Sequence, residues 1–353
     1  METWLLCQDD LERILQVIGR DELMRRMIDG LTAGFVELGR GDRPESPPRA
    51  GFTRDGDVPG VIELMPHREP GSSVTVKTIS YSPANAKLFG LPTIVGSIAR
   101  YDDDSGRLLS LADGVLLTAV RTGAASAVAS RLLAQPGSSR VGLVGAGAQA
   151  VTQLHGLSQI FDIDTVLVHD VNGAAAASFA NRADFLDLRV ETAGPQRILA
   201  ECDIICTATS VSVGAGPVLP DRGDRLPHLH LNSIGADEVG KTELPRSLLE
   251  EAFVCVDHRE QAEREGESQQ LQPNQIGPSL GHLSAHPAEA AAQRDGLTVF
   301  DSTGFALEDH IALDVFLAAA EELGLGTKVS IEHHPEDLLN PYSVRGVATA
   351  LRR

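Results

Sequence analysis

A glycine-rich turn between an apolar run and a helix is the feature that most constrains the fold of this chain. The sequence Gly-Ala-Gly-Ala-Gln-Ala occupies residues 145–150, directly after the apolar run Val141–Val144, and opens a predicted helix over Gln149–Ile160. In this context Gly145 permits a tight turn, and Gly147 lets the backbone approach a pyrophosphate. The N-terminus of the helix attracts the phosphates. The pattern therefore predicts a dinucleotide-binding site in a Rossmann-type domain.

An acidic residue at the end of the next predicted strand indicates which dinucleotide binds. Asp170 follows the apolar strand Thr165–His169 and lies 25 residues after Gly145. A carboxylate at this position accepts hydrogen bonds from the adenosine ribose and repels a 2′-phosphate. The sequence therefore favours NAD over NADP. The alternative is a glycine turn in an α/β domain that binds no nucleotide. It does not explain why the strand, the helix and the acidic residue occur together.

The chain downstream of a Pro-Gly-Ser-Ser hinge at residues 136–139 alternates apolar strands with helices. Fully apolar strands in such an order predict a parallel sheet that is covered on both faces. Beyond the glycine turn, the predicted strands are Thr165–His169, Leu188–Glu191, Asp203–Ala208, His228–Ile234, Phe253–Val256 and Leu297–Phe300.

The first part of the chain has a different pattern. Helical periodicity over the first 40 residues gives way to short β-type runs, which predict an antiparallel sheet. We therefore predict an α/β protein with two domains. One is a Rossmann-type NAD-binding domain over residues 136–309, and the other is an α+β antiparallel-sheet domain over residues 1–135, completed by about residues 310–353. The runs of the first sheet are Gly60–Met65, Ser73–Tyr81, Pro92–Tyr101 and Leu108–Ala112, and the helices Leu116–Leu133 and Ala306–Leu323 are expected to pack with it.

Charge excludes several classes of partner. The 353 residues carry a formal net charge of −19, and aromatic residues make up only 4%. Nucleic acid and anionic membranes should repel such a chain, and stacking platforms for bases are improbable. No apolar run approaches the length of a membrane span, and the first residues lack the basic region of a secretory signal. The expected partners are small molecules rather than nucleic acid or membrane.

The cysteines predict a reducing compartment. No Cys-x-x-Cys pair occurs among Cys7, Cys202, Cys206 and Cys255. We interpret them as reduced and mostly buried thiols of a cytoplasmic protein, and we expect no zinc. The histidines also lack a third ligand at metal spacing, so no metal is predicted.

Three basic residues in the first part of the chain are candidates for binding an anion. Lys77 interrupts a β-branched strand, where it either faces solvent or binds an anion. Arg121 begins an apolar helix, where it either forms a salt bridge at the helix start or contributes to a site. With Arg49, these cations would suit a carboxylate or phosphate substrate if they converge.

A further candidate follows the strand that ends at Ile234. The carboxyl ends of strands in an open α/β sheet face the ligand crevice, so Asp237 is placed for acid–base chemistry beside a nicotinamide. Lys241 would neutralise charge on the cofactor. The alternative for Asp237 is the N-cap of a helix over Thr242–Leu249.

These motifs resemble the ornithine cyclodeaminase/μ-crystallin family over nearly the whole chain. Three further segments resemble its bacterial members that act on lysine in natural-product pathways: residues 20–25, 65–71 and 331–335. The stretches that carry the family resemblance are Glu63–Pro66, Lys77 with Pro83–Asn85, Gly90–Thr93, Leu117–Thr122, Gly145–Gln149, Ile234–Glu243, Arg264–Glu267, Gln269–Leu271 and Asp301–Asp309.

The resemblance implies roles for individual residues. Asp237 would be the catalytic carboxylate, with Glu63 near the substrate amines. Arg49, Lys77 and Arg121 would hold the substrate α-carboxylate, Arg121 would also lie at the cofactor, and Thr303 would line the pocket. NAD would contact Thr93, Gly145, Gly147, Ala148, Gln149, Asp170, Thr209, Asn232, Lys241 and Ser302.

The implied activity is that of a lyase that uses NAD catalytically. L-Lysine would be converted to L-pipecolate and ammonia by hydride removal, intramolecular cyclisation, loss of ammonia and hydride return. The same residues would suit conversion of L-ornithine to L-proline, or an amino-acid dehydrogenase or ketimine reductase. A different class is a protein that holds NAD(P)H and a ligand without turnover. The resemblance also implies a homodimer that pairs through the antiparallel module.

Overall fold

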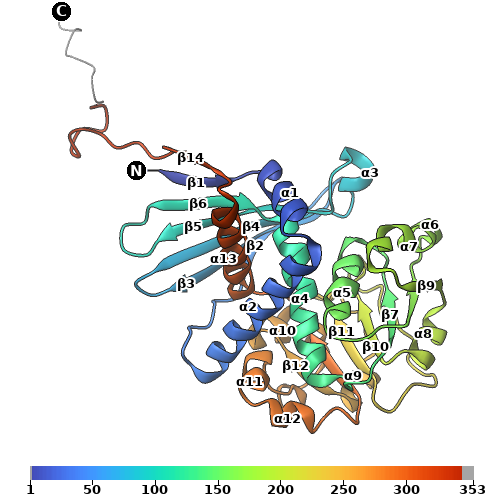
Figure 1. Ribbon diagram of the computed structural model, residues 1–353. Helices are drawn as coiled ribbons and strands as arrows, with labels where there is room; N and C mark the ends of the chain where they lie inside the picture. Colours follow the sequence, from blue (N-terminus) through green and yellow to red (C-terminus); the bar gives the residue numbers. More distant parts are fainter. Residues whose placement is uncertain (1, 344–353) are drawn as a thin grey trace, which may run out of the picture.

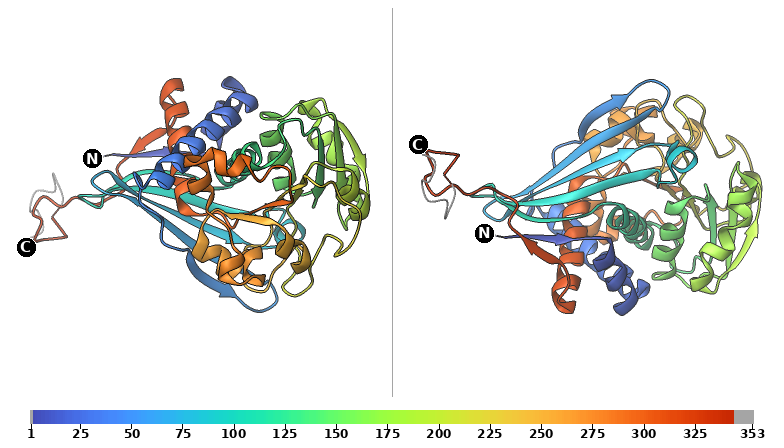
Figure 2. Two further views of the ribbon diagram at one scale, coloured as in Figure 1. Left: turned by 90° about the horizontal axis from the view of Figure 1, so that it is seen from below. Right: turned by 90° about the horizontal axis from the view of Figure 1, so that it is seen from above.

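The computed structural model describes residues 2–343, which form two seven-stranded sheets with helices between and around them (Figure 1). Seen from below and from above, the two sheets lie at opposite ends of the molecule, and long helices fill the space between them (Figure 2). Among residues 2–343, no helix combines the length and the apolar character that crossing a membrane requires.

The first sheet confirms the predicted strands of the N-terminal part and adds three strands, two at one side and one at the other. Its neighbours are antiparallel except for one parallel pair, formed by the strand at the N-terminus. The added strands are short or exposed, so they carry little apolar periodicity. In spatial order the strands are β14 (Thr327–Val329), β1 (Thr3–Leu6), β6 (Leu108–Asp113), β5 (Ile94–Asp102), β4 (Ser73–Tyr81), β3 (Gly60–Glu69) and β2 (Ala50–Arg54).

The second sheet is parallel throughout, as predicted for a Rossmann-type domain. Its central strands are buried on both faces, which explains their unbroken apolar sequences. The fold class predicted from the sequence is thus confirmed. In spatial order the strands are β12 (Phe253–Val256), β13 (Thr298–Asp301), β11 (His230–Ser233), β10 (Ile204–Thr207), β7 (Arg140–Val144), β8 (Thr165–His169) and β9 (Arg189–Thr192).

Helices from both ends of the chain fill the space between the sheets. A single apolar core joins α2, α4 and α13, so the C-terminal helix packs against the first part of the chain as expected. The longer helices are α1 (Gln8–Val17), α2 (Arg20–Arg40), α4 (Val115–Leu133), α5 (Ala148–Ser158) and α13 (Ala306–Leu323). The shorter ones are α3 (Asn85–Phe89), α6 (Gly173–Ala177), α7 (Phe179–Arg182), α8 (Pro195–Glu201), α9 (Arg246–Glu251), α10 (Arg259–Glu265), α11 (Leu280–Ala285) and α12 (Pro287–Ala291).

Two glycines allow α4 and α5 to cross in direct backbone contact. A Cβ added at Gly123 would lie 2.2 Å from the carbonyl oxygen of Thr152, and one added at Gly156 would lie 2.4 Å from the carbonyl oxygen of Gly123. Neither distance is compatible with a side chain, because the nearest atoms belong to the backbone. The crossing matters for function, since α4 carries Arg121 and α5 begins at the glycine turn.

Gly123→Ala should therefore destabilise the protein. The added methyl must push two packed helices apart, and overpacking of this kind costs about 1–3 kcal/mol. Gly137→Ala is the matched control, because a Cβ there meets no atom within 4 Å. Urea unfolding of both variants measures the difference. Equal midpoints would show that the crossing adapts without cost.

Candidate active site

A cavity of about 370 Å³ lies where the carboxyl ends of the second sheet meet the first sheet. It is lined by β3, β4, α4, the glycine turn and the loops after β10, β11 and β13. The structure brings thirteen of the sequence-predicted site residues to its wall: Arg49, Glu63, Lys77, Thr93, Arg121, Gly147, Ala148, Gln149, Thr209, Asp237, Lys241, Ser302 and Thr303.

Two of the predicted cations are buried and paired with acids from α13. Lys77 is only 1% exposed, so the alternative that it faces solvent is wrong. Its Nζ lies 2.8 Å from Asp309 Oδ1. Arg121 Nη1 lies 2.5 Å from Glu308 Oε2, and Arg121 Nε lies 3.2 Å from Asp309 Oδ1. The partners of Arg121 are thus on α13 rather than at the start of its own helix.

Burial changes the proton affinities of this group. Desolvation lowers the pKa of the Lys77 amine to about 8, although Asp309 opposes the change. Desolvation raises the pKa of the Glu308 carboxyl to about 8, against the effect of Arg121. Burial thus disfavours the charged form of Glu308, the partner of Arg121, and an incoming anion would compete with it for this guanidinium.

Arg49 is held at the cavity by a second set of acids. Its Nε lies 2.6 Å from Glu265 Oε1 and 3.3 Å from Glu63 Oε1. Its Nη2 donates to the carbonyl oxygen of Asp237 at 3.1 Å. Burial raises the pKa of Glu63, which makes this carboxyl a poorer acid than a solvated one.

Asp237 and Lys241 form an ion pair that faces the cavity, with 2.8 Å between Oδ1 and Nζ. Burial alone would lower the pKa of Lys241, but Asp237 and Tyr81 outweigh it and the net shift is upward. The Asp237 side chain is 33% exposed to solvent. The alternative of a helix N-cap is wrong, because the following helix begins only at Arg246.

The glycine turn has the geometry that a pyrophosphate requires. Gly145 has a φ of +97°, and a Cβ there would lie 2.4 Å from the carbonyl oxygen of Ala208. Gly147, by contrast, has no atom within 4 Å of an added Cβ, so its face is open to a ligand. Asp170 lies at the turn and accepts from the backbone N–H of Ala146 at 2.7 Å. The residues present therefore fit a dinucleotide.

Three predicted cofactor residues do not line the cavity: Gly145, Asp170 and Asn232. Gly145 and Asp170 belong to the turn that borders it. Asn232 is different, because its side chain is fully buried and donates to Ser130 Oγ at 2.9 Å. This amide joins β11 to α4, and the structure gives it a packing role rather than the predicted direct contact.

Sequence reasoning gave no individual role to the buried acid that organises the cavity floor. Glu243 Oε1 accepts from the N–H and the hydroxyl of Thr209 at 2.7 and 2.6 Å. Its Oε2 accepts from Thr207 Oγ1 at 2.6 Å and from the N–H of Gly235 at 2.8 Å. One carboxylate thus ties the loop after β10 to the loop after β11. The Ile234–Glu243 motif contained this residue, but spacing alone did not reveal its partners.

More buried acids continue this arrangement along the ends of β12 and β13. Burial raises the pKa of Glu267 to about 8 and that of Asp301 to about 7. Asp257 accepts from the N–H of Gly304 at 2.6 Å and from the Thr303 hydroxyl at 3.2 Å. The loop that presents Thr303 to the cavity is therefore fixed by a carboxylate behind it.

The histidines of this chain include one buried group that sequence spacing did not reveal. His67, Glu69 and His310 bring their ligand atoms within 4.8 Å of one another. Arg43 pairs with Glu69 at 2.7 Å, and Arg100 lies 3.2 Å from His310. These cations would compete with a metal ion, and the absence of a metal stays a prediction. A second, surface group consists of His282, His286 and Glu289.

A Rossmann-type sheet whose strand ends share a cavity with buried cations from the first part of the chain defines the class of this protein. The chain belongs to the ornithine cyclodeaminase/mu-crystallin family, whose family model matches residues 9–322.

Within the family, the chain is similar to several individual proteins. The L-lysine cyclodeaminase of Streptomyces rapamycinicus is 57% identical over 344 residues, which are 98% of this chain and all of that one. A solved structure of a lysine cyclodeaminase, described as recognising L-lysine, L-ornithine and L-2,4-diaminobutyric acid, is 61% identical with a TM-score of 0.95, over 97% of this chain and 99% of that one. An archaeal alanine dehydrogenase dimer with bound NAD is 27% identical with a TM-score of 0.80, over 94% of this chain and all of that one.

Replacing Glu243 should loosen the cavity floor. In Glu243→Gln an amide N–H₂ takes the place of one acceptor oxygen and faces donors, and one unsatisfied buried group costs about 1–3 kcal/mol. The free energy of unfolding in urea should fall by this amount. Glu250→Gln, at an exposed position of α9, is the control and should change little. An unchanged stability of Glu243→Gln would mean that the loops do not depend on this carboxylate.

Proposed function

We propose that this protein is an NAD-dependent L-lysine cyclodeaminase, which converts L-lysine to L-pipecolate and ammonia. The observation that carries the proposal is that one cavity is lined by four cations, two carboxylates and the glycine turn. The cations are Arg49, Lys77, Arg121 and Lys241, and the carboxylates are Glu63 and Asp237. The 57% identity to an L-lysine cyclodeaminase over nearly the whole chain supports it.

The substrate α-carboxylate binds among Arg49, Lys77 and Arg121, which all line the cavity. Lys77 and Arg121 come from neighbouring elements and share Asp309, while Arg49 approaches from the side of Glu63. A carboxylate that replaces part of these internal contacts gains charge-assisted hydrogen bonds in a cavity with little water. The substrate Cα is thereby held toward the glycine turn and the loop of Asp237.

NAD bound at the glycine turn would supply the acceptor for a hydride from the substrate Cα and, after cyclisation, the donor that gives it back. Gly147, Ala148 and Gln149 line the phosphate side, and Thr209, Lys241 and Ser302 line the remainder of the cofactor wall. Because the hydride is returned, the reaction has no net redox change. Closing the ring inside a small cavity exploits the high effective concentration of an amine on the same molecule.

Asp237 moves the protons of the cyclisation. The amine that attacks must be neutral, although a lysine side chain has a pKa near 10.4 in water. Asp237 faces the cavity and accepts this proton, then returns it to the departing α-amine. Lys241, 2.8 Å away, holds the carboxylate in position. Glu63, which Arg49 links to the Asp237 loop, lies beside the amines and helps to bind them.

The preference for lysine over ornithine rests on the relatives rather than on the cavity alone. The two substrates differ by one methylene, which accounts for about 0.8 kcal/mol of burial. Such differences seldom separate substrates by more than about 1–3 kcal/mol. We therefore propose that L-lysine is preferred and that L-ornithine is also converted. Thr303 lines the cavity where chain length would be sensed.

We also propose that the protein acts as a homodimer in the cytoplasm, with a substrate-binding and dimerisation domain over residues 1–135 completed by about 310–353 and an NAD-binding domain over 136–309. The dimeric state of the archaeal relative supports the first point. Three of the four cysteines are buried and none is in a disulfide within residues 2–343, in keeping with a reducing compartment.

An ammonia assay run beside absorbance at the NADH band tests the proposed function. Incubation with L-lysine and a catalytic amount of NAD should release one ammonia per lysine without accumulating NADH. Accumulation of NADH in proportion to ammonia would identify a dehydrogenase, and no ammonia would identify a binding protein. Higher efficiency on L-ornithine than on L-lysine would show that L-ornithine is the preferred substrate, and the proposed reaction class would stand.

Removing the proton carrier should stop turnover without unfolding the protein. Asp237→Asn keeps the size of the side chain but not its basicity, and we expect a loss of at least ~100-fold in kcat, the usual scale for general acid–base catalysis. NAD binding should persist. Asp104→Asn, in an exposed turn, is the control. Near-native turnover by Asp237→Asn would show that another group transfers the proton, and Glu63 would be the next candidate.

Asp170 should make the enzyme prefer NAD. A carboxylate near the adenosine ribose repels a 2′-phosphate, and we expect NAD to be favoured by at least about tenfold, or 1.4 kcal/mol. Asp170→Asn should reduce this ratio. Initial rates at limiting cofactor measure it. Equal rates with NAD and NADP in the unaltered protein would show that Asp170 does not face the ribose.

Lys77 should impose a pH limit on substrate binding. Burial lowers the pKa of its amine to about 8, so it loses its charge as the pH rises through that value. KM for L-lysine should therefore rise above about pH 8. Lys77→Arg carries a guanidinium that stays protonated, and its KM should lack this rise. Identical pH profiles of KM for both proteins would exclude Lys77 from the carboxylate site.

A further inference from the structure

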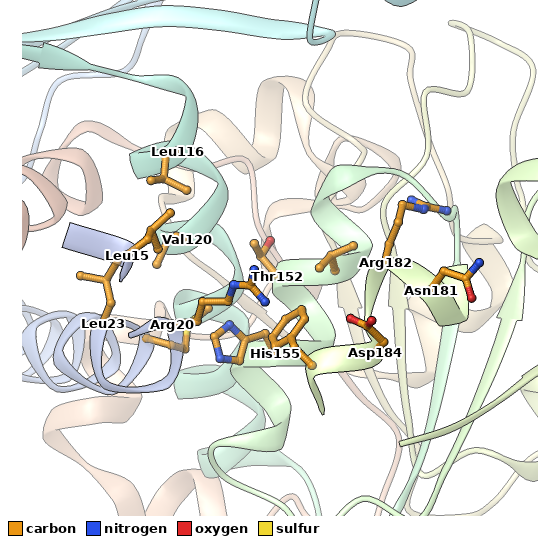
Figure 3. Close-up of a pocket in the computed structure, with 13 residues that line it drawn as sticks. Leu15, Arg20, Leu23, Leu116, Val120, Thr152, His155, Asn181, Arg182 and Asp184 are labelled. Atoms are coloured by element: carbon orange, nitrogen blue, oxygen red, sulfur yellow. The ribbon is translucent and has the colours of Figure 1, made fainter. Parts of the chain in front are cut away.

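A second cavity, of about 400 Å³, lies outside the proposed active site, between α1 and α2 on one side and α5 and α7 on the other. Its walls differ in chemistry (Figure 3). Leu15, Leu23, Leu116 and Val120 gather on one side, Asn181, Arg182 and Asp184 lie on the other, and Arg20 and His155 lie between them. The cavity is therefore amphipathic and has the volume of a small-molecule site.

One charged group at this cavity is a candidate for binding an anion. Arg20 and Arg182 form no ion pair with any residue in 2–343, and Arg20 lies over the Phe185 ring at 4.7 Å. Burial lowers the pKa of His155, which is therefore neutral, and its Nε2 lies 3.0 Å from Asp21 Oδ1. Two aspartates, Asp184 of the lining and Asp21 beside His155, match the two arginines in number. The candidate anion-binding group is therefore the guanidinium of Arg20, which stacks on Phe185 and has no ion pair among the described residues.

The two cavities share a wall. Thr118, Arg121 and Thr122 of α4 face the active site, whereas Leu116 and Val120 of the same helix face the second cavity. The start of α5 is divided in the same way: Ala148 and Gln149 line the active site, and Val151, Thr152 and His155 line the second cavity. A ligand on one side of these helices therefore contacts the elements that form the other site.

One hydrogen bond links the second cavity directly to the glycine turn. Arg182 Nη1 donates to the carbonyl oxygen of Ala146 at 2.6 Å, and its Nη2 donates to the carbonyl oxygen of Ala175 at the same distance. Ala146 lies between the two glycines that approach the pyrophosphate. A carboxylate that draws the guanidinium of Arg182 toward itself would remove this support from the turn.

We propose that the second cavity binds a small carboxylic acid with an apolar body and that its occupation weakens NAD binding. The carboxylate pairs with the guanidinium of Arg20 and draws that of Arg182 toward it, and the hydrocarbon part packs on the leucines of α1, α2 and α4. The effect is reciprocal, so NAD weakens binding of the acid by the same factor.

Calorimetric titration of the full chain with octanoate tests the binding site. Octanoate should bind saturably, and octylammonium, which has the same chain and the opposite charge, should bind at least about tenfold more weakly. Arg20→Gln should weaken octanoate at least about tenfold, the scale of one charge-assisted hydrogen bond. Arg25→Gln, on the exposed side of the same helix, is the matched control and should not.

A second pair of variants separates this cavity from the cationic active site. Val151→Trp places an indole in the second cavity and should abolish octanoate binding, whereas Ile331→Trp, at an exposed position outside both cavities, should not. Octanoate that still binds Arg20→Gln and Val151→Trp unchanged occupies the active site, and the proposal fails. Absence of saturable binding, or equal binding of octylammonium, overturns it as well.

The linkage to the cofactor is measured with NAD alone. At saturating octanoate the Kd of NAD should rise about fivefold or more, the lower end of ordinary coupling between sites. An unchanged Kd would refute the coupling. If NAD itself did not bind, the proposed function would fail, and octanoate binding would still be decided by the variants above.

Discussion

Burying Arg49, Lys77 and Arg121 around one cavity is the physical constraint on which the rest of this structure depends. An isolated buried charge is strongly unfavourable, so each cation needs an acid nearby. Lys77 and Arg121 obtain theirs from α13, and Arg49 obtains one from Glu265 in α10. The acids come from segments far along the chain, which requires the last helix to return to the first sheet. The ion pairs of the site therefore depend on the packing of α13 against the first sheet.

The same constraint shapes the other half of the cavity. Carboxylates behind the ends of β10, β11 and β13 accept from loop N–H groups and hydroxyls instead of pairing with cations. These acids hold the loops in one conformation, and Glu243 and Asp257 do so without reaching the cavity wall. Loops fixed in this way can present Asp237 and Thr303 to a substrate with little reorganisation, which is the condition for efficient proton transfer and ring closure.

Local sequence patterns were sufficient for the parts of the fold that depend on neighbouring residues. The glycine turn at residues 145–150, strand Ser73–Tyr81 and helix Ala306–Leu323 follow from periodicity and from known turn chemistry, and the structure confirms them. Strands β1, β2 and β14 are short or exposed, so neither apolar alternation nor turn signals mark them.

Some residues of the candidate site could likewise be predicted from local position, and others depend on strand register and tertiary packing. Position after the carboxyl end of a strand was enough to place Asp237 at the cavity. Asn232 lies two residues before the end of the same predicted strand, His228–Ile234, but its side chain points into the interior. Whether a strand residue points up or down depends on register, which the pattern did not fix. The acids Glu308 and Asp309 were visible as part of a motif, yet their pairing with Arg121 and Lys77 depends on tertiary packing.

Transfer of a labelled hydrogen tests the central claim, that one cavity removes a hydride from Cα, closes the ring and returns the same hydride. The measurement is mass spectrometry of the product formed from L-lysine deuterated at Cα, with unlabelled NAD in catalytic amount. The account predicts cyclic product that retains the deuterium at the former Cα, with one ammonia released per turnover. Product that has lost the deuterium, or label that accumulates in the cofactor pool, would contradict it.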